Sequence, residues 1–175
     1  VGLLLWYNTN GDGEDRINDV KLTPLGKLYD PQKRRAEFTR LQKLGIKGLK
    51  VDFFGSDKQF VIGYYLDLLE DAAKFGLNMT FHGATVPRGW RRTYPNLLTN
   101  EGVLGMEHQK FGAHNVNLSA AHHATLPFIR NVVGPMDYTP CNFSGKGLSA
   151  KRPTTIVHEL ALSVVFESGI QHFVE

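Results

Sequence analysis

Short apolar runs alternate with longer amphipathic stretches along the first half of the chain. The runs at residues 2–7, 46–53 and 77–81 predict strands. Between them, apolar residues three and four positions apart predict helices over 29–44 and from residue 56 to residue 75. This alternation is typical of an α/β fold with parallel strands.

The second of these helices has the clearest signals at its ends. Ser56 followed three residues later by Gln59 has the form of a capping box at the N-terminus. Gly76 directly follows the last apolar position, where a helix commonly ends. We therefore expect Ser56 to be the N-cap of this helix.

The second half of the chain has weaker periodicity. Residues 82–100 are rich in Gly, Pro, Arg and aromatic residues, which predicts a long functional loop with a short helical turn. Further strands are expected at 102–107, 130–136 and 170–174, and a helix at 153–168.

Six expected strands of one polarity indicate a partial (β/α)8 barrel (TIM barrel), roughly strands 3 to 8. A complete barrel of this kind needs about 250 residues, and this chain has 175. We therefore expect residues 1–175 to be one part of a longer catalytic barrel.

Composition excludes several other classes of protein. With 42% apolar and 21% charged residues, the chain is neither disordered nor fibrous. Its net charge of +3 is spread over scattered residues and short clusters, so we expect no nucleic-acid partner. No apolar run reaches the roughly 18 residues of a membrane span. The single cysteine, Cys141, excludes an internal disulfide.

The first candidate catalytic group is a carboxylate at the end of the strand expected at 46–53. Because side chains alternate along a strand, Lys50 and Asp52 share one face. Active sites of parallel barrels lie at the C-terminal ends of strands. A carboxylate beside an ammonium group stays ionised, as a nucleophile must. A buried structural ion pair is an equally compatible interpretation.

The second candidate group is Glu107, at the end of the apolar run that follows Glu101. An apolar setting raises the pKa of a carboxyl group, so Glu107 would hold a proton and act as a general acid. Taken alone, Glu107 is better explained as a capping or surface residue. Together with Asp52 it matches glycoside hydrolysis, in which retaining enzymes hold two carboxyl groups about 5–5.5 Å apart.

Aromatic and polar residues between the two carboxylates favour a sugar substrate. His82, Trp90 and Tyr94 combine apolar surface with hydrogen-bonding groups, which suit the faces and hydroxyls of a sugar ring. The arginines that flank Trp90 are suited to orient hydroxyls. Packing of the loop explains Trp90 and Tyr94 equally simply.

Three long segments of the chain resemble glycoside hydrolase family 97. They are GIKGLKVDFFGSDKQ at 45–59, MTFHGATVPRGWRRTYPNLLTNEGVLGMEH at 79–108 and HATLPFIRNVVGPMDYTP at 123–140. The resemblance implies a calcium-dependent barrel of α-glucosidase and α-galactosidase type, acting on an oligosaccharide or glycoside. It also implies an N-terminal β-sandwich and a C-terminal β-domain, both absent from this chain, and a periplasmic or secreted location.

The resemblance further implies a retaining mechanism. Retaining members carry their nucleophile in a Lys-Val-Asp-Phe motif, which matches Asp52. Inverting members lack that aspartate and use a glutamate directly after the histidine that matches His82, where this sequence has Gly83. The same pattern favours an α-galactosidase over an α-glucosidase.

The remaining roles also follow from the resemblance. The family's general acid falls on Glu107, and its calcium ligands include Glu101, with Glu107 close to the metal. Lys50 and His82 match sugar-binding positions. Further calcium ligands come from the β-sandwich, so we expect the site in this chain to be incomplete, because calcium takes six to eight oxygens.

Two other classes of function stay open at this level. A metal-dependent hydrolase would use the histidines, of which the chain has seven, but their spacing matches no ligand set. The zinc-protease motif is excluded at His158-Glu159 because Leu162 stands where the second histidine is needed. A non-catalytic sugar-binding barrel is the other alternative. The sequence predicts no oligomeric state.

Overall fold

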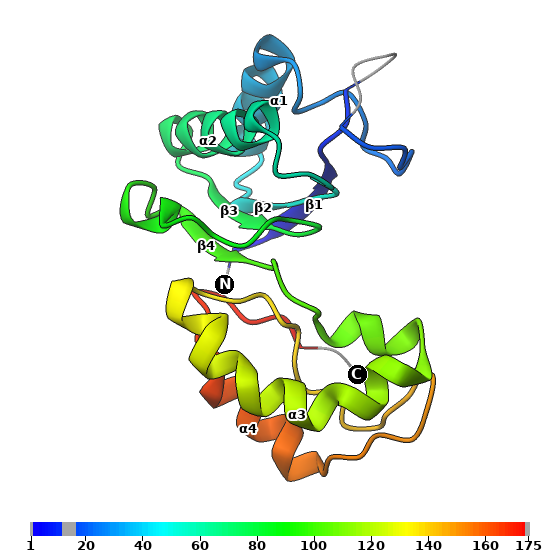
Figure 1. Cartoon of the computed structure of the whole chain (residues 1–175). Coiled ribbons are helices and arrows are strands. Elements are labelled where there is room, and N and C mark those ends of the chain that lie inside the picture. Colours follow the sequence, from blue (N-terminus) through cyan, green and yellow to red (C-terminus); the bar gives the residue numbers. More distant parts are fainter. Residues whose placement is uncertain (1, 12–16, 174–175) are drawn as a thin grey trace. The chain divides into compact units, whose positions relative to one another are not determined.

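The computed structural model describes residues 2–11 and 17–173 of the chain. These form two compact units, residues 1–100 and residues 101–175 (Figure 1). Within the described residues, no helix combines the length and the apolar character that a membrane span requires. Each unit is described by itself below.

The first unit contains a four-stranded parallel sheet in the order β1-β2-β3-β4. Its strands are β1 Leu4–Asn8, β2 Gly48–Asp52, β3 Asn78–Phe81 and β4 Leu97–Asn100. The predicted parallel α/β fold is confirmed, and the first three strands lie where the apolar runs placed them. The fourth was missed, because residues 82–100 were interpreted as a loop. That segment also contains the expected helical turn, η1 Trp90–Arg92.

Two helices, α1 Pro31–Lys43 and α2 Gln59–Lys74, lie together on one side of the sheet (Figure 1). Their apolar stripes are fully buried at Phe38 and Leu41 of α1 and Leu68 of α2. The N-cap of α2 is Lys58, two residues later than the predicted Ser56. The Ser56 hydroxyl accepts the N–H of Lys58 instead of capping the helix, so the predicted capping box is wrong.

An ion pair inside the first unit joins the two helices. Arg34 Nη2 of α1 lies 2.6 Å from Asp71 Oδ2 of α2, and both side chains are almost fully buried. Arg35 adds a second contact to the same carboxylate from the exposed side. Arg34 and Arg35 therefore anchor α1 to α2.

The second unit is built from helices and turns. Its elements are η2 Met106–Lys110, α3 Ala113–Ile129, η3 Asn131–Val133 and α4 Ile156–Val165. Helix α4 confirms the helix predicted at 153–168, with the Thr155 side chain accepting the N–H of His158 at its start. Helix α3 was not predicted.

The three strands predicted in the second unit are wrong, because no strand occurs in its described part, residues 101–173. Residues 102–107 lead into the 3-10 turn η2, and residues 130–136 contain η3. Residues 170–173 are irregular, and Val174 lies outside the described residues. Four parallel strands with covering helices are therefore observed, and the partial barrel stays a prediction.

Candidate active site

Asp52 is the last residue of β2, at the carboxyl end of the parallel sheet. The register places Asp52 beside Asn8 of β1, and Lys50 between Trp6 of β1 and Thr80 of β3. Side chains of alternate residues share a face, so Trp6, Lys50 and Asp52 point to the same side of the sheet. Asp52 is buried there, with 7% of its surface exposed.

Three groups from separate parts of the sheet hold the Asp52 carboxylate. Trp6 Nε1 donates to Oδ2 at 3.0 Å, and His82 Nδ1 lies 3.3 Å from the same oxygen. The backbone N–H of Phe53 donates to Oδ1 at 2.6 Å. Each carboxylate oxygen therefore has a donor, which fixes the orientation of the group.

These contacts set the ionisation of Asp52. Burial raises the pKa of the carboxyl group, but the hydrogen bond and charge of His82, with the bonds from Trp6 and Phe53, outweigh it. The net result is a pKa below the ordinary value for aspartate. The expected ionised state is thus supported, but its main source is His82, whereas the sequence pointed to Lys50.

The backbone after Asp52 is held in an unusual conformation. Phe53 has φ 68°, in the left-handed region that non-glycine residues rarely adopt. This turn directs its N–H back to the carboxylate. The Phe53 carbonyl accepts the Thr9 hydroxyl at 2.8 Å and the Asn18 side-chain amide. Strained backbone of this kind clusters at functional sites.

Aromatic rings from the segment after β2, from α2 and from η1 stack on one another. Phe54 stacks on Tyr65 with centroids 3.8 Å apart, and Tyr65 stacks on Trp90 at 4.9 Å. Trp90 is 8% exposed and belongs to the apolar core, and Tyr94 packs against that core. This position agrees with the packing interpretation of Trp90, and its contact with sugar stays a prediction.

Glu107 lies in η2 of the second unit, and its side chain is exposed. The apolar strand end predicted for it is therefore wrong. Glu101 is buried, with 5% exposed. One carboxylate oxygen of Glu101 and one of Glu107 lie within 4.8 Å of each other. Two carboxylates this close match the donor type that calcium prefers.

Arg130, which the sequence did not single out, holds the segment that carries Glu101. Its guanidinium donates to the carbonyls of Glu101 at 2.9 Å and Gly102 at 3.0 Å. It also donates to Gly134 at 3.0 Å and Pro135 at 3.2 Å. Burial lowers the pKa of Arg130 to about 10. Through these four carbonyls, the buried guanidinium links residues 101–102 to residues 134–135.

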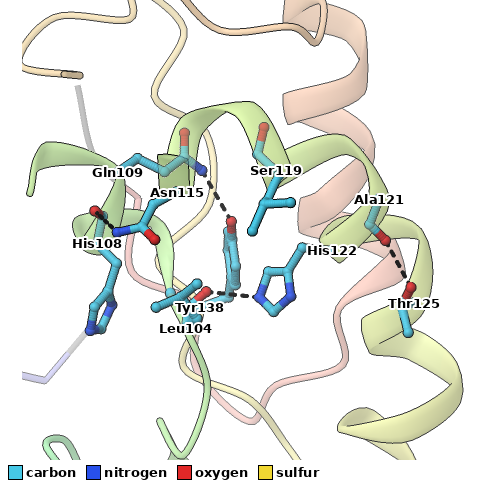
Figure 2. Close-up of a pocket in the computed structure, with 11 residues that line it drawn as sticks. Leu104, His108, Gln109, Asn115, Ser119, Ala121, His122, Thr125 and Tyr138 are labelled. Carbon is cyan, nitrogen blue, oxygen red and sulfur yellow. Dashed lines mark hydrogen bonds between the residues drawn. The ribbon is translucent and has the colours of Figure 1, made fainter. Parts of the chain in front are cut away.

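A cavity of about 270 Å³ lies between η2, α3 and Tyr138 (Figure 2). Hydrogen bonds around it fix the segment on either side of Glu107. His122 Nε2 is 2.9 Å from the Leu104 carbonyl, and Asn115 donates to the His108 carbonyl at 2.9 Å. Gln109 Nε2 donates to the Tyr138 hydroxyl at 3.3 Å. The backbone carrying Glu107 is thus anchored, although its side chain is exposed.

Two of the histidines, the buried His123 and the half-buried His158, form a separate cluster. His123 Nδ1 lies 2.8 Å from His158 Nε2, and Glu159 offers a carboxylate oxygen within 4.8 Å of both. Burial, followed by the charges of neighbouring basic groups, lowers the pKa of His123 to about 3. Arg152 Nε lies 3.6 Å from the Glu159 carboxylate and already supplies a positive charge. His123 Nε2 also bonds the Tyr138 hydroxyl, so hydrogen bonds orient the His123 ring from both sides.

Comparison with known families and proteins gives a consistent result. The family model described as glycoside hydrolase 97 matches residues 8–103. A protein of Streptomyces bingchenggensis named probable retaining alpha-galactosidase is 41% identical over 147 residues, 83% of this chain and 21% of that protein. A retaining alpha-galactosidase of Bacteroides thetaiotaomicron is 38% identical over 134 residues, 72% of this chain and 20% of that protein.

Solved structures resemble the chain along nearly its whole length. A crystal structure of a beta-arabinopyranosidase has a TM-score of 0.89 and 39% identity, covering 99% of this chain and 28% of that one. A family 97 enzyme of Pseudoalteromonas sp. strain K8 in complex with acarbose has a TM-score of 0.69 and 27% identity. The match covers 97% of this chain and 27% of that one. The chain thus spans about a fifth of the curated relatives and under a third of these structures.

Proposed function

Because the chain belongs to glycoside hydrolase family 97, we propose that it carries the nucleophile and the general acid/base of a retaining α-galactosidase. The observation that carries the proposal is the Asp52 carboxylate, buried at a strand's carboxyl end with a lowered pKa. Two relatives that match 83% and 72% of the chain are named probable retaining alpha-galactosidase and retaining alpha-galactosidase.

In the proposed reaction, Asp52 attacks the anomeric carbon of a terminal α-galactoside and forms a covalent glycosyl ester. Glu107 donates a proton to the departing oxygen. In the second step Glu107 removes a proton from water, which attacks the same carbon and releases Asp52. His82 and Trp6 hold the carboxylate in place, which supports the role of Asp52. Lys50 and His82 are proposed to bind the sugar, with Trp90 at the margin of that site.

A calcium ion is proposed to bind at Glu101 and Glu107. The short separation of their carboxylate oxygens supports this assignment. Two carboxylates supply only part of the six to eight oxygen ligands that calcium takes, so other segments must complete the site. When bound, calcium would supply positive charge beside the acid. We also propose a periplasmic or secreted location, on the resemblance alone.

The anomeric form of the first product tests the mechanism. The full-length protein is given an aryl α-galactoside, and the sugar released is followed by proton NMR before mutarotation. Retention predicts that α-galactose appears first. An initial β product would contradict the role of Asp52 as nucleophile and the role of Glu107 as base in the second step.

A second substrate class is favoured by one comparison. The structure with a TM-score of 0.89 is that of a beta-arabinopyranosidase. L-Arabinopyranose in its β-form has the ring stereochemistry of an α-galactoside without the hydroxymethyl group. Rates on matched aryl α-galactoside, β-L-arabinopyranoside and α-glucoside substrates distinguish the candidates. A preference for the α-glucoside would contradict both and favour the α-glucosidase alternative.

A further inference from the structure

Gly83 lies directly against the proposed nucleophile. It follows His82 after β3 and has φ +50°, in the left-handed region. A Cβ atom at this position would stand 2.8 Å from Asp52 Oδ1, 2.8 Å from the Phe53 nitrogen and 3.0 Å from the Phe53 Cα. Real Cβ atoms essentially never approach other atoms below 3.0 Å.

The atoms around Gly83 differ in how easily they can move. The Phe53 backbone is fixed because its carbonyl accepts the Thr9 hydroxyl at 2.8 Å. Gly83 is itself held, since its carbonyl accepts the Gly55 N–H at 3.1 Å. A side chain at position 83 would therefore displace Asp52 Oδ1 and would also press on the Phe53 backbone that supplies its donor. Displacement would break its 2.6 Å bond from the Phe53 N–H.

We propose that Gly83 is a positioning residue for the nucleophile. The absent side chain leaves the space in which Asp52 Oδ1 sits on the Phe53 N–H while Oδ2 accepts from Trp6. A side chain at residue 83 and a correctly held aspartate at residue 52 exclude each other. This inference rests on the proposed function, because it assigns Gly83 a part in holding the attacking group.

The test compares Gly83→Ala with Gly76→Ala in the full-length protein. Gly76 also has a positive φ, +65°, but a Cβ there meets nothing within 4 Å. Both variants share the backbone strain, and only Gly83→Ala adds the clash. We expect Gly83→Ala to lower kcat on an aryl α-galactoside by about 100-fold, the order expected for a displaced reacting group. Gly76→Ala should keep the wild-type rate.

Two further readouts separate positioning from general damage. With its Phe53 bond lost, Asp52 has a higher pKa, so the acidic limb of the rate profile should move to higher pH in Gly83→Ala only. In an Asp52→Gly background the clash with Oδ1 is absent and only the contacts with the Phe53 backbone persist. Gly83→Ala should therefore reduce azide-rescued turnover less than it reduces the wild-type rate. A Gly83→Ala protein that folds only in that background would support the same steric conflict.

Equal kcat and pH profiles for the two alanine variants would overturn the role of Gly83. So would equal losses in the wild-type and Asp52→Gly backgrounds, or failure to fold in both. Each of these results leaves the proposed function intact, because wild-type turnover and product stereochemistry are measured independently. An initial β product from the wild type would instead refute the proposed function.

Discussion

The two proposed catalytic carboxylates have opposite surroundings. Asp52 is 7% exposed and is held by donors from β1, from the residue after β2 and from the residue after β3. Glu107 is exposed on a short 3-10 turn, and the hydrogen bonds nearby hold its backbone neighbours. The first side chain is fixed by direct contacts, and the second is located through its backbone.

This difference indicates how the protein positions each carboxylate. Register in a parallel sheet brings strand ends together, so neighbouring strands can set both the geometry and the pKa of Asp52. The hydrogen bonds of Asn115 and His122 fix the backbone on either side of Glu107, but leave its side chain exposed. Variants of the two carboxylates and their partners test this contrast.

Removing the fixed carboxylate should have the largest effect. Asp52→Gly deletes the nucleophile, so turnover of an aryl α-galactoside should fall by at least about 10³-fold. Azide, which can enter the vacated space, should restore part of the rate and give a β-galactosyl azide, identified by NMR. Without the loss of rate or the azide product, Asp52 is not the nucleophile.

Changing the exposed carboxylate should have a smaller effect that depends on the substrate. Glu107→Gln removes proton transfer, which contributes about 10²–10⁴-fold. The loss in kcat should be greatest for substrates with basic leaving groups and least for activated aryl glycosides. Glu70→Gln, at an exposed glutamate paired with Lys74 on α2, should keep the wild-type rate. A Glu107 effect independent of the leaving group would contradict the acid role.

The next variant addresses the pH dependence of the buried carboxylate. His82 makes the largest contribution that lowers the pKa of Asp52, while burial raises it. His82→Leu removes the contribution that lowers the pKa of Asp52, while the effect of burial remains. The pKa of Asp52 should therefore rise, and the acidic limb of kcat/KM should move to higher pH. His82→Asn keeps a side-chain donor without the charge and should give a smaller shift. Unchanged acidic limbs would show that another group controls the ionisation.

The smallest effect is expected for Trp6. Trp6→Phe keeps most of the ring but removes the N–H that donates to Asp52 Oδ2 at 3.0 Å. One hydrogen bond to a charged group is worth about 1.5–3 kcal/mol, and the other donors remain, so kcat should fall by about 3–10-fold. Phe38→Leu alters a fully buried ring of α1 in the core and should change the melting temperature more than kcat. Equal losses of kcat in both variants would contradict the role of the indole N–H.

Sequence patterns predicted the first unit much better than the second. Strands β1 and β2 and helices α1 and α2 have strong apolar periods, and the burial of their apolar residues confirms the pattern. Strand β4 was hidden because it is only four residues long and follows a segment rich in Pro and Arg. Helix α3 was missed because it contains several polar residues and Pro127.

Candidate residues were predicted with similar unevenness. The alternation of side chains along β2 predicted the position of Asp52 correctly, because this alternation is a local property of any strand. Trp6 was missed, although it pairs with Lys50 in the parallel sheet and therefore lies on the same face as Asp52. The partnership of His82 with Asp52 depends on a neighbouring strand 30 residues away, and the exposure of Glu107 depends on a turn. Short-range periodicity carries neither kind of information.

The hydrogen bond from Trp6 gives the protein an internal spectroscopic label. The indole proton lies against an anionic oxygen in the resting state, and that oxygen would belong to a neutral ester once a sugar is attached to Asp52. The nitrogen-15 chemical shift and the solvent exchange rate of this one proton should therefore differ between the two species. Trapping of the ester could then be followed directly, without a chromogenic leaving group.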